Sequence, residues 1–199
     1  MIIVRRRDQV TSEWIVGHDS LATNAFANNK FLKLNDANAT YTNGLVWGSQ
    51  PTSTVFQVST GDAGNLNTSG GTYVAWCFHS VEGYSKVGSW KNNNNNNGTF
   101  IHTGFRPAYV MSKCASDGER WFVWDSVRNP HNPVDSMFAV PNTSVGDGNN
   151  SAHNAYPEFC SNGIKIRSTN TSSDEITFGS RTHIFIAFAE TPFKYSNAR

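Results

Sequence analysis

The sequence carries the same pattern of strands twice, and the second copy follows the first after about 107 residues. The matching segments are Ile2-Ile3-Val4 with Tyr109-Val110-Met111, Trp14-Ile15-Val16 with Trp121-Phe122-Val123, and Thr72–Phe78 with Thr182–Phe188. A repeat of roughly 90 to 100 residues is too long for a solenoid unit and is typical of duplicated small sheets. The duplication favours a structural or binding protein over an enzyme with one asymmetric active site.

The composition predicts an all-β fold. Hydrophobic residues make up only 38% of the chain and charged residues 16%, while aromatic residues reach 13%. Much of the remainder is Asn, Ser, Thr and Gly, which favour turns and disfavour helix interiors. We therefore expect two tandem homologous antiparallel β modules that form a sandwich-like body. The expected division is 1–90 for the first module, 91–106 for an Asn-rich loop and connector, and 107–199 for the second module.

Alternating patterns and turn dipeptides place the strands. In the first module we expect them near Met1–Arg6, Glu13–His18, Lys30–Leu34, Ser53–Ser59 and Thr72–Ser80. In the second module we expect them near Tyr109–Lys113, Arg120–Asp125, Ser136–Val140, Gly163–Ser168 and Thr182–Glu190, with a short strand at Phe100–His102 between the modules. No window has an apolar stripe of helical width, so we expect no helix.

Two of these strands are apolar on both faces. Thr72–Ser80 places Tyr73, Ala75 and Cys77 on one side and Val74, Trp76 and Phe78 on the other, and His183–Phe188 behaves likewise. Strands of this kind are usually covered on both faces. We therefore expect both strands to be buried, either inside a covered sheet or between the modules.

The connector contains six consecutive asparagines, Asn92 to Asn97, closed by Gly98. A run of this composition buries little surface, and we expect a solvent-facing loop or a hairpin tip. The second copy is introduced by Gly104-Phe105-Arg106-Pro107, whereas the first begins at once with Met1. Met1 is therefore either the start of the protein or an internal residue of a longer chain.

Charge and cysteine content narrow the partners and the compartment. The formal net charge is +1, so no global field would attract nucleic acid or an anionic membrane. No apolar stretch is long enough to span a bilayer, and we expect no membrane insertion. Cys77, Cys114 and Cys160 lack CxxC spacing and cannot all pair, so we expect three reduced, buried thiols and no intrachain disulfide.

The chemistry-bearing residues form no catalytic pattern, and we expect no catalytic residue, no metal and no cofactor. The six histidines are scattered without HxH or HExxH spacing. His79 and His183 sit on apolar-rich strands, where a satisfied core or interface histidine is the expectation. No serine lies in a GxSxG elbow, and no glycine-rich loop precedes a helix.

Acidic residues support the same conclusion. Asp19-Ser20 and Asp125-Ser126 recur at matching repeat positions, which fits a turn that ends a strand in each copy better than catalysis. Asp62 and Asp147 could offer oxygen ligands to calcium, but neither lies in a DxDxDG loop. No pair of carboxylates suggests a glycosidase.

Aromatic residues are expected both in the cores and on a binding surface. The expected core anchors are Trp14, Trp121, Trp76, Phe78, Ile186 and Phe188. Trp47, Trp90 and Trp124 lie near turns or on strands with polar neighbours, which is typical of rings that stack on glycans or fill protein interfaces. The alternative is that these three are ordinary core tryptophans.

Five segments are distinctive when taken together: Tyr73–Lys86, Thr103–Ala108, Asp125–Pro133, Ser161–Arg167 and Ala187–Arg199. Over almost the whole chain they resemble a family of uncharacterised β-rich domains in the virion proteins of marine tailed phages. Family members lie in tail-fibre or structural proteins, sometimes beside laminin-G-like or concanavalin-like sandwich domains. Members tend to have a mixed Asn/Gly/Ser hairpin where this chain has Asn92 to Asn97.

The resemblance implies a bacteriophage virion surface protein, assembled in the host cytoplasm. It implies a tail-fibre or adsorption module that binds neighbouring virion subunits, with a glycan or receptor on the host surface as a further partner. A homo-oligomer is expected, a trimer if the protein belongs to a tail fibre. A capsid decoration protein is the alternative, and a carbohydrate-active enzyme is less favoured. The resemblance brings no catalytic residues with it.

Overall fold

The computed structural model describes residues 1–42, 45–59, 66–134, 136–140, 148–149, 155–169 and 176–193. It divides the chain into two compact units, Met1–Phe78 (unit 1) and His79–Arg199 (unit 2). Each unit is described here by itself. Both are built from antiparallel strands, and a single 3₁₀ turn at Asp19–Leu21 is the one helical segment among the described residues. The all-β prediction is confirmed.

Unit 1 contains a four-stranded sheet in the order β3-β2-β1-β6. Its strands are β1 (Ile2–Arg6), β2 (Trp14–Gly17), β3 (Leu32–Lys33) and β6 (Tyr73–Cys77). A two-stranded sheet of β4 (Trp47–Ser49) and β5 (Gln57–Val58) accompanies it. The core contains Ile2, Val4, Ile15, Phe26, Phe31, Val46, Trp47 and Leu66. It therefore joins one face of the larger sheet to Trp47 of the smaller one.

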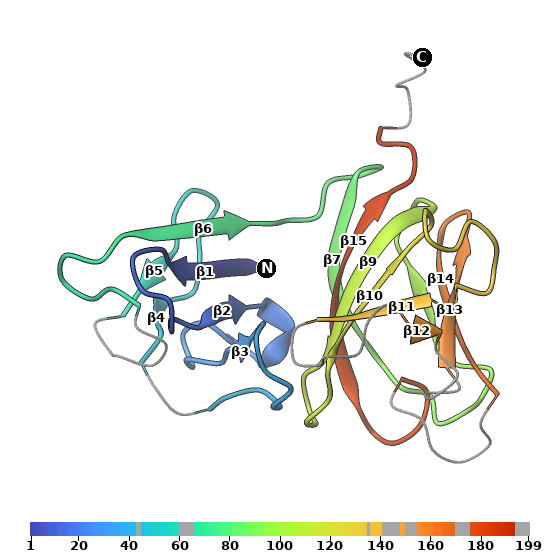
Figure 1. Ribbon diagram of the computed structural model, residues 1–199, viewed down its shortest axis with the longest axis horizontal. Coiled ribbons are helices and arrows are strands. Elements are labelled where there is room, and N and C mark those ends of the chain that lie inside the picture. Colours follow the sequence, from blue (N-terminus) through green and yellow to red (C-terminus); the bar gives the residue numbers. More distant parts are fainter. Residues whose placement is uncertain are drawn as a thin grey trace. The chain divides into compact units, whose positions relative to one another are not determined.

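Unit 2 contains a six-stranded sheet in the order β12-β11-β10-β9-β15-β7 and a three-stranded sheet in the order β13-β14-β8 (Figure 1). The strands of the larger sheet are β7 (Ser85–Lys91), β9 (Pro107–Cys114), β10 (Trp121–Asp125), β11 (Ser136–Val140), β12 (Gly148–Asn149) and β15 (Thr182–Ala189). The smaller sheet contains β8 (Phe100–His102), β13 (Ala155–Cys160) and β14 (Gly163–Ser168).

The core of unit 2 is shared by its two sheets. Trp90, Val110, Phe122, Trp124, Phe185 and Ala187 come from the larger sheet, and Ile101, Phe159, Ile164 and Ile166 from the smaller one. Side chains from two facing sheets that meet in one apolar layer define a β-sandwich. The sandwich-like body expected from the sequence is thus present.

The repeat in the sequence corresponds to a repeat in the sheets. The order β3-β2-β1-β6 in unit 1 matches β11-β10-β9-β15 in unit 2, and every pair is antiparallel. Residues that lie directly opposite one another on adjacent strands can be compared across the whole sheet. In unit 1 one such row is Leu32, Val16, Ile3, Trp76, and the matching row in unit 2 is Phe138, Val123, Met111, Ile186. Ile3 therefore corresponds to Met111, one residue further along than the sequence comparison placed it.

The boundary between the units lies earlier than the expected residue 90. Residues 85–90 of the expected first module, together with Lys91 of the expected connector, form β7 of unit 2, which pairs with β15 along its whole length. The local sequence pattern indicates this strand only weakly, because its seven residues include only two large apolar side chains and a glycine in the middle.

β6 is not buried on both faces, so that prediction is wrong. The strand lies at the edge of its sheet and pairs only with β1. As a result Trp76 is 39% exposed, and Cys77 and His79 are exposed as well, although the sequence predicted a buried strand. β15 matches its prediction, because consecutive residues from His183 to Ala187 are all buried.

The expected core anchors fall into two groups. Trp121 and Ile186 are buried, whereas Trp14, Phe78 and Phe188 are only partly buried. Trp14 stacks on Trp76 with ring centroids 5.4 Å apart, outside the apolar core of unit 1. The cause is the pleat: Trp14 points to the face opposite Ile15, which does lie in the core.

The run Asn92 to Asn97 is exposed but held by hydrogen bonds. Asn92 Nδ2 donates to Phe178 O over 2.7 Å, and Asn94 Oδ1 accepts from Gly179 N over 3.1 Å. Asn94 has a φ of 59°, a left-handed conformation that asparagine tolerates better than most residues. These hydrogen bonds therefore hold the loop in place on unit 2.

The repeated Asp-Ser pairs differ in role. Asp125 Oδ1 accepts from the amides of Val127 and Arg128, as a residue that begins a turn does. The register-equivalent residue in unit 1 is His18, whose Nδ1 accepts from Ser20 N. Asp19 instead accepts a hydrogen bond from Gln50 Nε2. The turn role predicted for Asp125 is confirmed. The same prediction is wrong for Asp19, because His18 has that role in unit 1.

Two tryptophans of unit 1 should differ in their contribution to stability. Trp47 is 1% exposed, and its Nε1 donates to Lys30 O. Trp47→Ala should lower the free energy of unfolding by about 3–5 kcal/mol, since it leaves a large cavity. Trp14→Ala should cost about 1–2 kcal/mol, because it removes a half-buried ring and one stacking contact. Urea unfolding of both variants tests this, and equal destabilisation would contradict the burial assignment.

The three thiols should differ in their reactivity toward an alkylating reagent. All three are free, with Cys77 exposed, Cys160 half-buried and Cys114 buried. Burial raises the pKa of the Cys114 thiol, which lowers its thiolate fraction further. A short iodoacetamide pulse on the native protein should label Cys77 first and leave Cys114 unlabelled, whereas the unfolded protein should label at all three. A mass two hydrogens lower than that of the free thiols would show a disulfide instead.

Candidate functional site

The tryptophans proposed as a binding surface are buried. Trp47 and Trp124 are each 1% exposed and belong to the two cores, so they cannot stack on a ligand at the surface. The prediction is wrong for these two residues, because each faces the interior of its unit. Trp90 is 6% exposed but also lines a cavity, which keeps it in a candidate site.

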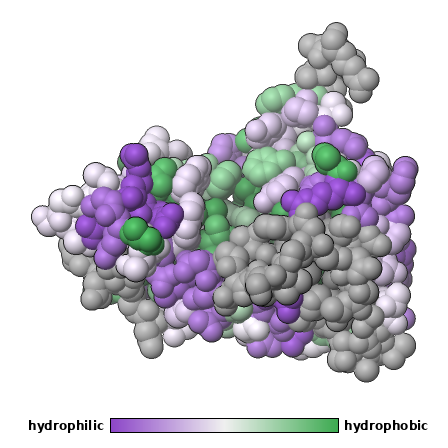
Figure 2. All heavy atoms as spheres, in the orientation of Figure 1, coloured by the Kyte–Doolittle hydropathy of each residue, from purple (hydrophilic) through white to green (hydrophobic). Residues whose placement is uncertain are grey.

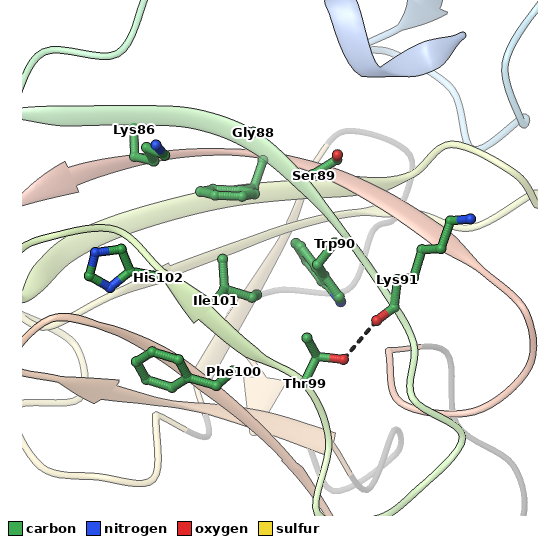
Figure 3. Close-up of a pocket in the computed structure, with 10 residues that line it drawn as sticks. Lys86, Gly88, Ser89, Trp90, Lys91, Thr99, Phe100, Ile101 and His102 are labelled. Carbon is green, nitrogen blue, oxygen red and sulfur yellow. Dashed lines mark hydrogen bonds between the residues drawn. The ribbon is translucent and has the colours of Figure 1, made fainter. Parts of the chain in front are cut away.

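The cavity lies between two strands that follow one another in the chain without pairing. β7 is the edge of the six-stranded sheet, and β8 is the edge of the three-stranded sheet. The loop 92–99 joins them, yet among the described residues no bridge links the two strands. Near the loop Thr99 Oγ1 donates to Lys91 O over 2.7 Å (Figure 3). Beyond this bond a groove separates the two edges.

Most of the outer edge of β7 is covered by the protein itself. Ser85 exchanges backbone hydrogen bonds with Val81. The Ser80 hydroxyl accepts from Val87 N and donates to Val87 O. Lys91 O accepts from Thr99 as described. In an antiparallel strand the backbone N–H and C=O groups of every second residue point to the same side. The backbone groups of Ser89 therefore also point away from β15, and they have no partner among the described residues.

The outer edge of β8 faces the groove from the other side. Ile166 N donates to Thr99 O and Thr103 N donates to Asn162 O, so the odd residues of this segment pair with β14. Alternation therefore turns the backbone groups of Phe100 and His102 away from β14, and no partner for them is found in the described part of the chain. The groove thus has unpaired donors and acceptors on both walls.

The groove has a volume of about 290 Å³. Figure 3 shows Trp90 from β7 and Ile101 from β8 pointing into the gap between the strands. Phe185 of β15 lines it next to Gly88, where an added Cβ would lie 3.0 Å from the Phe185 ring. Gly88 therefore leaves room for the ring in the floor. These buried rings make the floor apolar.

The rim of the groove is polar and positive. Lys86 and His102 lie at the end away from the Thr99–Lys91 bond, and Lys91 lies at the other end (Figure 3). None of the described lining residues is acidic, and neither lysine forms an ion pair with a described residue. The Phe100 ring is 43% exposed but extends over Gly163 of β14, away from the groove. A ligand that carries negative charge would find its counter-ions here.

Trp90 brings one unsatisfied donor to this site. Its Nε1 is buried and has no hydrogen-bond partner among the described residues, although tryptophan usually finds one when buried. Its ring stacks on His183, with ring centroids 4.7 Å apart and planes 9° apart. The stack holds the indole in place at the groove.

The other chemistry-bearing residues do not gather. His18 and His183 are buried, whereas His79, His102 and His131 are exposed, so the core expectation for His79 is wrong. Asp62 and Asp147 lie outside the described residues. Within the described ranges, no group of three or more His, Cys, Asp or Glu side chains could hold a metal ion.

One of the comparisons with known proteins identifies a family. The model of a domain of unknown function (DUF7483) matches residues 1–192. The chain belongs to the DUF7483 family. No curated protein and no solved structure matches the chain. Within this DUF7483 chain the family match spans both units and includes both walls of the groove.

Sequence reasoning found only part of the site in the DUF7483 chain. The sequence predicts Trp90 as a binding residue and Phe100–His102 as a strand, but it predicts no strand at Ser85–Lys91. A weak signal is present, because Val87 and Trp90 are the large apolar residues of a segment that lies between Gly83 and the Asn97-Gly98 turn dipeptide. No helix in the described part of the chain is long and apolar enough to cross a membrane.

The remaining surface of the DUF7483 chain offers scattered apolar residues. Exposed large side chains include Val10, Leu45, Val55, Trp76, Tyr84, Val127 and Phe193. Figure 2 shows hydrophobic residues as isolated spots among hydrophilic ones on unit 1. Apolar residues exposed singly are normal on soluble domains. The groove between β7 and β8 is therefore the best-built candidate site.

Proposed function

We propose that the protein is a binding module and performs no catalysis. The observation that carries this proposal is the groove between two unpaired sheet edges, with an apolar floor, a positive rim and no carboxylate among its described lining residues. Concave apolar sites with a few convergent polar groups are where proteins bind ligands. Glycoside hydrolysis needs a pair of carboxyl groups across the bond that breaks, and the lining supplies none.

The particle to which the module belongs is, in this proposal, a tailed-phage virion. The support is the resemblance of Tyr73–Lys86, Asp125–Pro133 and Ala187–Arg199 to the β-rich domains of marine phage structural proteins. A tail-fibre or adsorption protein is the first form of the proposal, and a capsid decoration protein is the second. Its partners are neighbouring virion subunits, further copies of the chain (two more, forming a trimer, in a tail fibre) and a molecule of the host surface.

Purified particles test this proposal directly. Phage particles are purified by density gradient from a lysate of the strain that expresses the chain, and an antibody raised against residues 1–193 is followed by gold labelling in the electron microscope. We expect gold at the tail. Labelling over the whole head would select the decoration form. If the chain is missing from purified particles while abundant in the lysate, the virion proposal fails.

A further inference from the structure

We propose that the groove between β7 and β8 binds one acidic sugar residue of a surface glycan. This inference rests on the proposed binding function and names the class of ligand. The ligand is a sugar ring that carries a carboxylate or a sulfate group. The assignment rests on the size of the groove, the pattern of its open backbone groups and its charge.

The small volume of the groove and the hydrogen bonds that cover the edge of β7 favour a compact ligand over a peptide that adds a strand. A peptide that extends a sheet needs a run of open backbone groups on the edge strand. On β7 the hydrogen bonds of Val81, Ser80 and Thr99 close most of the edge and, among the described residues, leave open only Ser89 and the amide of Lys91. A volume of about 290 Å³ lies at the lower end of the range for small-ligand sites. One sugar residue suits both limits.

The mixture of donors and acceptors favours a ligand with hydroxyl groups. Ser89, Phe100 and His102 offer backbone carbonyls as well as amides to the groove. A fully ionised anion such as sulfate only accepts hydrogen bonds and would be repelled by those carbonyl oxygens. Sugar hydroxyls both donate and accept, as serine and threonine hydroxyls do.

The charge of the rim favours an acidic sugar over a neutral one. Lys86 and His102 stand at the open end of the groove, and none of its described lining residues is acidic (Figure 3). A carboxylate that accepts from an ammonium group forms a charge-assisted hydrogen bond, about twice as strong as a neutral one.

The test is saturation-transfer NMR and calorimetry on the full chain. The probes are trigalacturonate, sialyllactose and a sulfated heparin disaccharide, each beside a neutral counterpart such as galactotriose or lactose. At least one acidic sugar should bind, and its neutral counterpart should bind about tenfold more weakly or not at all. A penta-aspartate peptide and inorganic phosphate are run in parallel as competitors.

Matched variants locate the binding. Lys86→Gln should weaken the binding of the acidic sugar about tenfold. Arg7→Gln, which removes the same charge from an exposed arginine of unit 1, should leave the affinity unchanged. Near-UV circular dichroism checks that each variant keeps the native fold. Trp90 is left intact in this test because it also belongs to the core.

Each remaining outcome overturns the inference. Equal binding of neutral and acidic sugars would remove the role of charge. Displacement by phosphate alone would indicate a site for simple anions, and displacement by the peptide alone would indicate a protein partner. No binding of any sugar at millimolar concentration would reject a glycan site. If the chain is found on particles while these tests fail, the virion proposal stands and only the ligand assignment falls.

Discussion

β15 is the strand on which the architecture of unit 2 depends. It pairs with β9 on one side and with β7 on the other, and residues from His183 to Ala187 are all buried. Its partners lie far from it in sequence, so this pairing holds together the beginning and the end of the unit. Because β15 occupies the inner position, β7 becomes the edge of the sheet. The open wall of the groove follows from that placement.

The comparison of the two units shows what the added strands do. In unit 1 the strand equivalent to β15 is β6, which has no neighbour on its outer side among the described residues. Trp76 on this edge strand is 39% exposed, whereas its register equivalent, Ile186, lies on a strand paired on both sides and is 2% exposed. A strand corresponding to β7 exists only in unit 2 among the described residues. The duplication supplied the common four-stranded sheet, and the groove arose from the strands that only one copy has.

Sequence patterns predicted the common sheet well and the site poorly, for physical reasons. The segments Trp14-Ile15-Val16 and Trp121-Phe122-Val123 predicted equivalent strands, because they carry apolar side chains at matching positions. They did not reveal that Trp14 points away from the core, since face assignment depends on which side the second sheet covers. Whether β6 is an edge depends on a partner strand that the local sequence does not contain. The sequence did not predict a strand at β7, because Gly88 and its polar neighbours weaken the strand pattern.

Hydrogen exchange at single amides tests most directly the claim that the groove is an open seam between two sheet edges. In the free protein the amide of Ser89 should exchange at least about a hundredfold faster than those of Gly88 and Trp90, which face β15. The amides of Phe100 and His102 should exchange faster than that of Ile101, which faces β14. NMR-detected exchange resolves each of these residues. If Ser89 is protected as strongly as Trp90, the edges are closed in solution and the account of the groove is wrong.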